Sequence, residues 1–150
     1  MYFDQSNLPN ENYFHTMYAR LHVFDGSGLE NYRMVYESNE THYDIFGKPA
    51  RNIKIFEYVK GAKIAGKVSP KETVSLSGTI ITNQRRMFEY AQQVKADEKG
   101  DFEFTVPYSI DDPYETRLLK SYELIYGNSS RSVPVSENDI LNGYKILAER

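Results

Sequence analysis

Three histidines are the first residues that could do chemistry, because imidazole acts as an acid or base near neutral pH and binds metals. His15 and His22 stand seven residues apart in a stretch with helical spacing, and His42 lies in a polar segment. At a rise of ~1.5 Å per residue the first two would lie about 10 Å apart, too far to share a metal ion without a bend. We therefore expect all three to be surface or packing residues.

Carboxylates gather at two places and invite a calcium hypothesis, since hard cations prefer oxygen ligands. Asp97 and Glu98 stand close to Asp101, and Asp111 directly precedes Asp112. The first group lacks the spacing of an EF-hand calcium loop and fits a hairpin turn. We assign it to turn chemistry and predict no metal ligand in this chain.

Gly26-Ser27-Gly28 has the composition of a phosphate-binding loop. Such loops lie between a strand and a following helix, whereas here a predicted helix comes first, so the glycines are expected to end that helix. No Ser-His-Asp or Cys-His arrangement can be assembled, since cysteine is absent and the serines stand in turn contexts. The sequence predicts no catalytic residue and no cofactor-binding residue.

Two segments match the N-x-Ser/Thr acceptor pattern for N-glycosylation, Asn39-Glu40-Thr41 and Asn128-Ser129-Ser130. In a chain with this much Asn, Ser and Thr, about one match is expected by chance. The pattern fits an external location and leaves open whether Asn39 and Asn128 are glycosylated.

The totals narrow the class of protein. A length of 150 residues suits one domain. The net charge of −3, with scattered Lys and Arg, argues against a nucleic-acid partner. No segment approaches the ~20 apolar residues of a membrane span. The first residues lack the basic and apolar stretches of a secretion signal, so we expect this segment to encode no address of its own.

An amphipathic helix is predicted over residues 13–25, where Phe14, Met17, Leu21 and Phe24 recur at three- and four-residue spacing. Residues 1–12 are expected to fray. Residues 30–150 read as β-rich. Residues 32–37 are predicted to form a half-exposed strand, because alternate residues differ in character: Tyr32, Met34 and Tyr36 alternate with Arg33, Val35 and Glu37. Residues 38–51 read as a polar loop.

Further strands are expected at residues 53–59, 63–67, 73–82, 87–94, 102–106, 121–126, 131–135 and 144–147. Short strands at regular spacing are typical of sandwiches and barrels. The predicted fold is mainly β, a β-sandwich or partly closed barrel with one N-terminal amphipathic helix.

Two blocks resemble the C-terminal globular region of the archaeal oligosaccharyltransferase AglB. One spans residues 17–29 and continues through residues 32–38, and the other spans residues 53–64 at a similar distance downstream. The remainder, including Thr82-Asn83-Gln84 and residues 97–108, looks like the β-rich tail of those proteins. The resemblance covers nearly the whole chain after the first dozen residues.

In that family a multi-pass membrane protein moves a glycan from a dolichol-phosphate-type lipid to the Asn of N-x-Ser/Thr, using a divalent metal such as Mn or Mg. Its acidic metal ligands lie in the membrane part, and a Trp-Trp-Asp-Tyr-Gly motif reads the acceptor. This chain contains no Trp. The resemblance therefore implies that residues 1–150 are one non-catalytic C-terminal domain on the extracytoplasmic face of the membrane.

The expected partners are the upstream catalytic soluble domain and the transmembrane domain of the same polypeptide, and the membrane is reached only through that parent segment. The opening helix could form the contact surface or could pack on its own sheets. Two rival functions stay open. One is a stand-alone β-sandwich module that binds carbohydrate or protein at a cell surface, and the other is a cytoplasmic small-molecule enzyme.

Overall fold

A five-stranded sheet forms the larger layer of the protein. The structure is a computed structural model that describes residues 9–44 and 46–148. The order of four strands is β11-β10-β6-β7, and the short strand β9 pairs with the end of β6. All of these pairs are antiparallel. The strands are β6 (Thr73–Ile81), β7 (Met87–Lys95), β9 (Arg117–Leu118), β10 (Tyr122–Tyr126) and β11 (Ser129–Val133).

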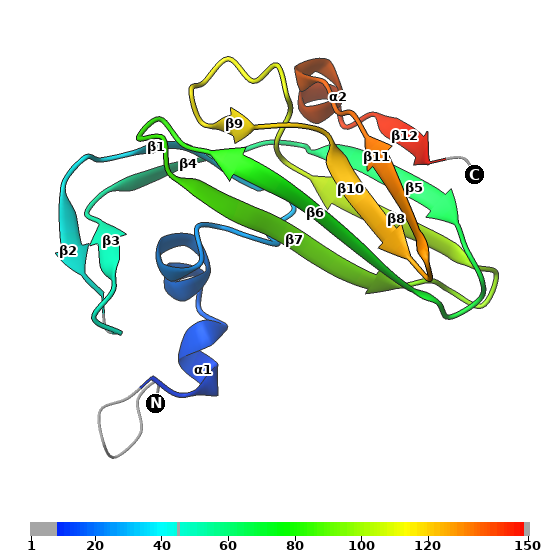
Figure 1. Cartoon of the computed structure of the whole chain (residues 1–150), viewed down its shortest axis with the longest axis horizontal. Helices are drawn as coiled ribbons and strands as arrows, with labels where there is room; N and C mark the ends of the chain where they lie inside the picture. The colour runs from blue at the N-terminus through cyan, green and yellow to red at the C-terminus, as the bar shows by residue number, and fades with distance from the viewer. Residues whose placement is uncertain (1–8, 45, 149–150) are drawn as a thin grey trace.

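A three-stranded sheet in the order β12-β5-β8 forms the second layer. β5 (Ala62–Lys67) pairs antiparallel with β8 (Asp101–Val106) and parallel with β12 (Lys145–Ala148). The helix α2 (Glu137–Asn142) precedes β12. Figure 1 shows β5 and β8 behind β6, β7 and β10.

One apolar core lies between these two sheets. Alternate residues of β6 are buried, such as Leu76 and Ile80, and β8 buries Phe104 and Val106 in the same cluster. Since side chains of a strand point alternately to its two faces, this pattern places one face of each sheet against the other. The mainly β class is therefore confirmed, and the sheets of residues 9–44 and 46–148 form no closed barrel.

Tyrosines carry hydroxyl groups into this core, and their hydroxyls are bonded to the backbone. The Tyr108 hydroxyl accepts from the Met34 backbone N–H at 2.7 Å, and the Tyr122 hydroxyl donates to the Tyr108 carbonyl at 3.0 Å. The Tyr90 hydroxyl donates to the Leu29 carbonyl at 2.8 Å. A buried hydroxyl needs such a partner, so these bonds fix residues before and within β1 against the core.

A two-stranded ribbon of β1 (Tyr32–Glu37) and β4 (Lys54–Tyr58) extends from the sheets and leads to the hairpin of β2 (Thr41–Tyr43) and β3 (Pro49–Arg51) (Figure 1). The register of β1 shifts between Met34 and Tyr36. The prediction that residues 38–51 form only a polar loop is wrong, because this segment contains both strands of the hairpin.

The N-terminal amphipathic helix predicted over residues 13–25 is not confirmed as one element. The chain forms a short α1 (Glu11–Phe14) and a π-helix η1 (Ala19–Val23). Between them the Thr16 hydroxyl donates to the Tyr13 carbonyl and accepts from the Ala19 N–H. A side chain that takes these backbone partners competes with a continuous helix. The fraying expected for residues 1–12 falls mainly on residues 1–8, which lie outside the described residues.

Two further elements replace predicted connections. β9 lies in the segment between β8 and β10, and α2 lies where residues 136–143 were expected to connect two strands. Ser136 caps α2 by accepting from the Asp139 N–H, and the Asp139 carboxylate accepts from the Ser136 N–H. Gly143 ends the helix at a φ of 70°, a conformation that glycine adopts readily.

Candidate functional site

Arg33 is the centre of the most deeply buried charged group, which we call the Arg33 cluster. Its guanidinium, 1% exposed, donates at 2.8 Å to Glu57 of β4 and at 2.8 Å to Asp112. It also makes a two-pronged contact of 2.8 and 2.9 Å to Glu137 of α2. Its Cζ atom lies 5.5 Å from the centre of the Tyr114 ring. The Arg33 cluster therefore joins the β1–β4 ribbon, the segment after β8 and α2.

Three carboxylates compete for this one cation. Burial raises the pKa of Asp112 to about 6, with further contributions from Glu137 and Glu57 that outweigh the hydrogen bonds and the charge of Arg33. Burial opposes ionisation of Glu137 as well, but hydrogen bonds from Arg33 and Ser109 outweigh it and lower the pKa of Glu137. The Asp112 side chain is 0% exposed, so it offers no open position for acid or base chemistry.

A second charged group, the Arg86 cluster, is built on Arg86, which follows the turn between β6 and β7. Arg86 binds both oxygens of Asp25 at 2.7 Å and contacts Glu37 at 2.6 Å. Glu37 is fully buried and also accepts from the Thr82 hydroxyl at 2.6 Å. Lys54 donates to Asp25 at 2.7 Å. These bonds hold the loop after η1 against β1, β4 and β6.

Beside this cluster lies a pocket of about 240 Å³, which we call the Arg86 pocket. Burial opposes ionisation of Asp25 on its floor, but hydrogen bonds from Arg86 and Lys54 outweigh burial and lower the pKa of Asp25. The charged side chains of its lining come from the loop after η1, the β2–β3 hairpin, β4 and the turn before β7. They are Asp25, Asp44, Lys48, Arg51, Lys54 and Arg86.

The structure brings two of the three histidines together. The His22 ring stacks on His42 with centroids 5.6 Å apart and on Tyr18 at 5.3 Å. Burial, then Lys54 and His42, lower the pKa of His22. His15 takes no part in this stack. Among residues 9–44 and 46–148, no three His, Asp or Glu side chains are grouped to hold a metal ion.

Gly26-Ser27-Gly28 follows η1 and precedes β1, as expected for a helix end. Gly26 and Gly28 have φ values of 73° and 74°. The Ser27 hydroxyl donates to the Glu89 carbonyl at 2.9 Å and accepts from the Ala91 N–H at 3.1 Å. This loop therefore covers the edge of β7 and has a structural role.

The carboxylates singled out in the sequence separate into two kinds. Asp97 accepts from the N–H groups of Lys99 and Asp101, so the turn assignment is confirmed, and Glu98 forms an exposed ion pair of 3.5 Å with Lys71. Asp111 and Asp112 instead face α2. Asp111 accepts from the Glu137 N–H at 2.6 Å, and Asp112 belongs to the Arg33 cluster.

Both acceptor asparagines are exposed. Asn39 lies between β1 and β2, and Asn128 lies in the turn between β10 and β11. Exposure is necessary for modification, and whether Asn39 and Asn128 are glycosylated stays open.

The alternation of residues 32–37 predicts a half-exposed strand but does not reveal that Arg33 and Glu37 are both buried. Their partners stand far away in the sequence, which is why alternation alone could not assign them. A signal was present in principle, since the oppositely charged Arg33 and Glu37 fall on the same face of one strand by alternation. Charged residues that must face inward need partners from elsewhere in the chain.

No helix among the described residues has the length and apolar character needed to cross a membrane. A family model for the archaeal glycosylation protein B (AglB) long peripheral domain matches residues 61–146. The dolichyl-phosphooligosaccharide-protein glycotransferase 3 of Archaeoglobus fulgidus is 31% identical over 194 aligned residues, which cover 91% of this chain and 22% of that protein.

Two solved structures are similar throughout the chain. The Archaeoglobus fulgidus oligosaccharyltransferase in complex with Zn and sulfate gives a TM-score of 0.86 at 29% identity and covers 96% of this chain. AglB from the same organism, in complex with an inhibitory peptide and a dolichol-phosphate, gives a TM-score of 0.84 at 29% identity. The chain spans 25% and 23% of these two structures.

Proposed function

The chain belongs to the archaeal glycosylation protein B family as a long peripheral domain, and from this we propose that it is a non-catalytic domain of an oligosaccharyltransferase. The family match over residues 61–146 carries the proposal. The parent enzyme would transfer a glycan from a dolichol-phosphate-type lipid to the Asn of N-x-Ser/Thr. This similarity favours the peripheral domain over a stand-alone binding module.

The domain would act through shape and contact surface, with residues 1–150 forming one unit whose two facing sheets make a β-sandwich. Since the chain spans 22% of its Archaeoglobus relative, most of the parent polypeptide lies outside it. We place the bond-making groups and a divalent metal, Mn or Mg, in that remainder. The Zn in a related crystal structure supports a metal in the parent. The domain itself would lie on the extracytoplasmic face.

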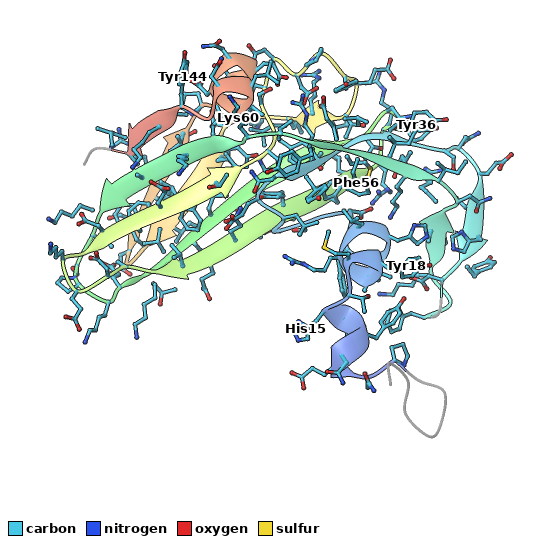
Figure 2. The ribbon with its side chains drawn as sticks, turned by 180° about the vertical axis from the view of Figure 1, so that it is seen from behind. His15, Tyr18, Tyr36, Phe56, Lys60 and Tyr144 are labelled. Atoms are coloured by element: carbon cyan, nitrogen blue, oxygen red, sulfur yellow. The ribbon has the colours of Figure 1, made fainter. Side chains whose placement is uncertain are left out.

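The N-terminal segment is the proposed contact surface with the upstream catalytic domain. Met17 and Tyr18 are 44% and 60% exposed, although their spacing first suggested a core-facing helix. Large apolar side chains that stay exposed beside one another often mark an interface. Figure 2 shows Tyr18 and His15 on the segment that lies apart from the sheets, at the opposite end from Tyr144.

Glycan transfer by the full-length parent enzyme tests this proposal. Tyr18→Asp should slow transfer to an acceptor peptide by roughly tenfold or more, the effect of a charge at a packed contact. Tyr144→Asp is the matched control, because Tyr144 is 52% exposed and distant from Tyr18. It should leave the rate within about twofold. Circular dichroism of both variants would check that each is folded.

Two results would contradict the proposal separately. Equal transfer rates for the two folded variants would remove the contact surface at Tyr18. Glycan transfer by the 150-residue chain alone, supplied with lipid donor and acceptor peptide, would remove the non-catalytic role.

A further inference from the structure

The Arg86 pocket carries more positive than negative charge, although the whole chain has a net charge of −3. Lys48, Arg51, Lys54 and Arg86 line it together with two carboxylates, Asp25 and Asp44. Four cations against two anions leave two positive charges in excess with the histidines neutral. Glu37, which lies beneath the lining and binds Arg86, still leaves an excess of one. The pocket is therefore electrostatically suited to an anion.

Two of these cations are fixed in place by the fold. Lys54 is 5% exposed and donates to Asp25 and to the His22 carbonyl. Arg86 is held by its double contact to Asp25. Charges that are already ordered lose little conformational entropy when a ligand arrives. Asp25 and Glu37 balance these two charges, so the excess positive charge of the pocket comes from Lys48 and Arg51 against Asp44.

The other two cations keep donors for a ligand. Lys48 is exposed and forms no ion pair within the described part of the chain. Arg51 donates from Nη1 to the Asn39 carbonyl at 2.8 Å, and its Nε atom lies 3.7 Å from Glu37. This leaves N–H groups of its guanidinium without a hydrogen-bond partner among residues 9–44 and 46–148. Lys48 lies in the turn of the β2–β3 hairpin and Arg51 lies at the end of β3, and both line the same pocket.

The size of the pocket limits the ligand. Its volume of about 240 Å³ is below the roughly 300–1,000 Å³ of pockets that enclose whole drug-sized molecules. It suits an ion or one charged group of a larger molecule. The stacked His22 ring forms part of its wall and adds a flat surface beside the cations.

We propose that the Arg86 pocket binds a small oxyanion, namely a phosphate, a sulfate or a carboxylate group. Lys48 and Arg51 bind the oxygens directly, and Lys54 and Arg86 order the floor of the pocket through their bonds to Asp25 and Glu37. The guanidinium fork of Arg51 matches the geometry of such groups. This site adjoins the contact surface at Tyr18, whose ring stacks on His22 of the pocket wall, but it does not rest on the role in glycan transfer.

Titration of the 150-residue chain with inorganic phosphate, sulfate and glucuronate, followed by amide NMR shifts at low salt, tests the site. At least one of these three anions should shift the amide resonances of the β2–β3 hairpin, whereas neutral glucose should not. Lys48→Gln should weaken binding by about five- to tenfold, equivalent to roughly 1 to 1.4 kcal/mol. Arg51→Gln should weaken it at least as much.

Lys60→Gln is the matched control, since Lys60 is an exposed lysine next to α2 and distant from the pocket (Figure 2). It should change affinity by less than about twofold. The absence of any saturable shift, or an equal loss in the Lys48 and Lys60 variants, would overturn the proposal. Sedimentation with vesicles that contain phosphatidic acid then shows whether the bound anion belongs to a lipid or to a soluble molecule. Binding to vesicles that Lys48→Gln abolishes indicates a lipid phosphate, and binding of soluble anions alone indicates a free anion or a sugar acid.

Discussion

Replacing Asp112 by asparagine tests how three carboxylates share Arg33. The Asp112 side chain is 0% exposed, accepts from Arg33 at 2.8 Å and accepts from the Tyr114 N–H at 2.9 Å. Asparagine keeps the size and one acceptor but removes the charge. Because Glu57 and Glu137 also contact Arg33, the substitution lowers the repulsion between carboxylates while costing one hydrogen bond.

The expected effect depends on pH in a definite direction. The folded-state pKa of Asp112 is about 6, above the ordinary 3.8. The folded chain thus holds this proton more tightly than the unfolded chain. The stabilisation linked to Asp112 is therefore complete below pH 3.8 and is lost as the pH rises to about 6. A gap of about two pH units corresponds to about 3 kcal/mol, which solvent screening at the half-exposed Glu57 reduces to roughly 1 to 2 kcal/mol.

Urea unfolding of the natural chain and of Asp112→Asn, between about pH 4 and about pH 7, measures this effect. The free energy of unfolding of the variant, relative to the natural chain, should rise by roughly 1 to 2 kcal/mol across that range. Asp101→Asn, which removes an exposed carboxylate 3.9 Å from Lys67, supplies the baseline. A difference for Asp112→Asn that stays constant with pH would refute the reasoning about burial.

Three further changes follow from the structure. Arg33→Met should lower the free energy of unfolding by about 3 to 5 kcal/mol, since it leaves buried carboxylates without their cation, and a loss below about 1 kcal/mol in urea unfolding would contradict this. Ser136→Ala should cost about 1 kcal/mol through loss of the α2 cap, whereas the exposed Ser132→Ala should leave the thermal midpoint unchanged. His42→Ala should raise the pKa of His22 in an NMR titration, because burial, Lys54 and His42 all lower it, and an unchanged midpoint would show that the stack has no electrostatic effect.

The strands that bury one face could be predicted from the sequence. β6 and β8 alternate buried and more exposed residues because the two sheets enclose one core. Every second residue of these strands is therefore apolar, which is the pattern that predicts a strand. β2 and β3 leave no such record, since all three residues of β2 are exposed. Their pairing depends on the chain reversal that Asp44 supports by accepting from the Phe46 and Lys48 N–H groups.

The sequence predicted one continuous helix over residues 13–25 that the structure does not contain, and it did not predict α2; each failure has a physical reason. Apolar residues of the N-terminal segment have helical spacing, yet Met17 and Tyr18 remain exposed, so the spacing does not record packing against this domain's core. α2 was missed because its apolar residues are few. Its Ser136 and Asp139 form a capping box, and Gly143 ends it, so the capping pattern carried the signal that periodicity did not.

The candidate site could not be predicted, because its residues are brought together only by the tertiary fold. The Arg86 pocket combines residues from η1 and the loop after it, the β2–β3 hairpin, β4 and the turn before β7. In the sequence, neither Arg51 nor Arg86 has an acidic residue within two positions that would reveal the direction of its side chain. Only the turn assignment of Asp97 rested on neighbours close enough to be seen in the sequence.

The Arg33 cluster also bears on how the chain folds as the ribosome produces it. Arg33 bonds to residues 24, 79 and 104 positions further along, the last of them in α2. Since synthesis proceeds from the N-terminus, the guanidinium emerges long before two of its three anions exist. The β1–β4 ribbon therefore waits, incompletely anchored, until nearly the whole domain has left the exit tunnel. Slowing translation late in this segment would prolong that exposed interval, whereas slowing it before Arg33 would not.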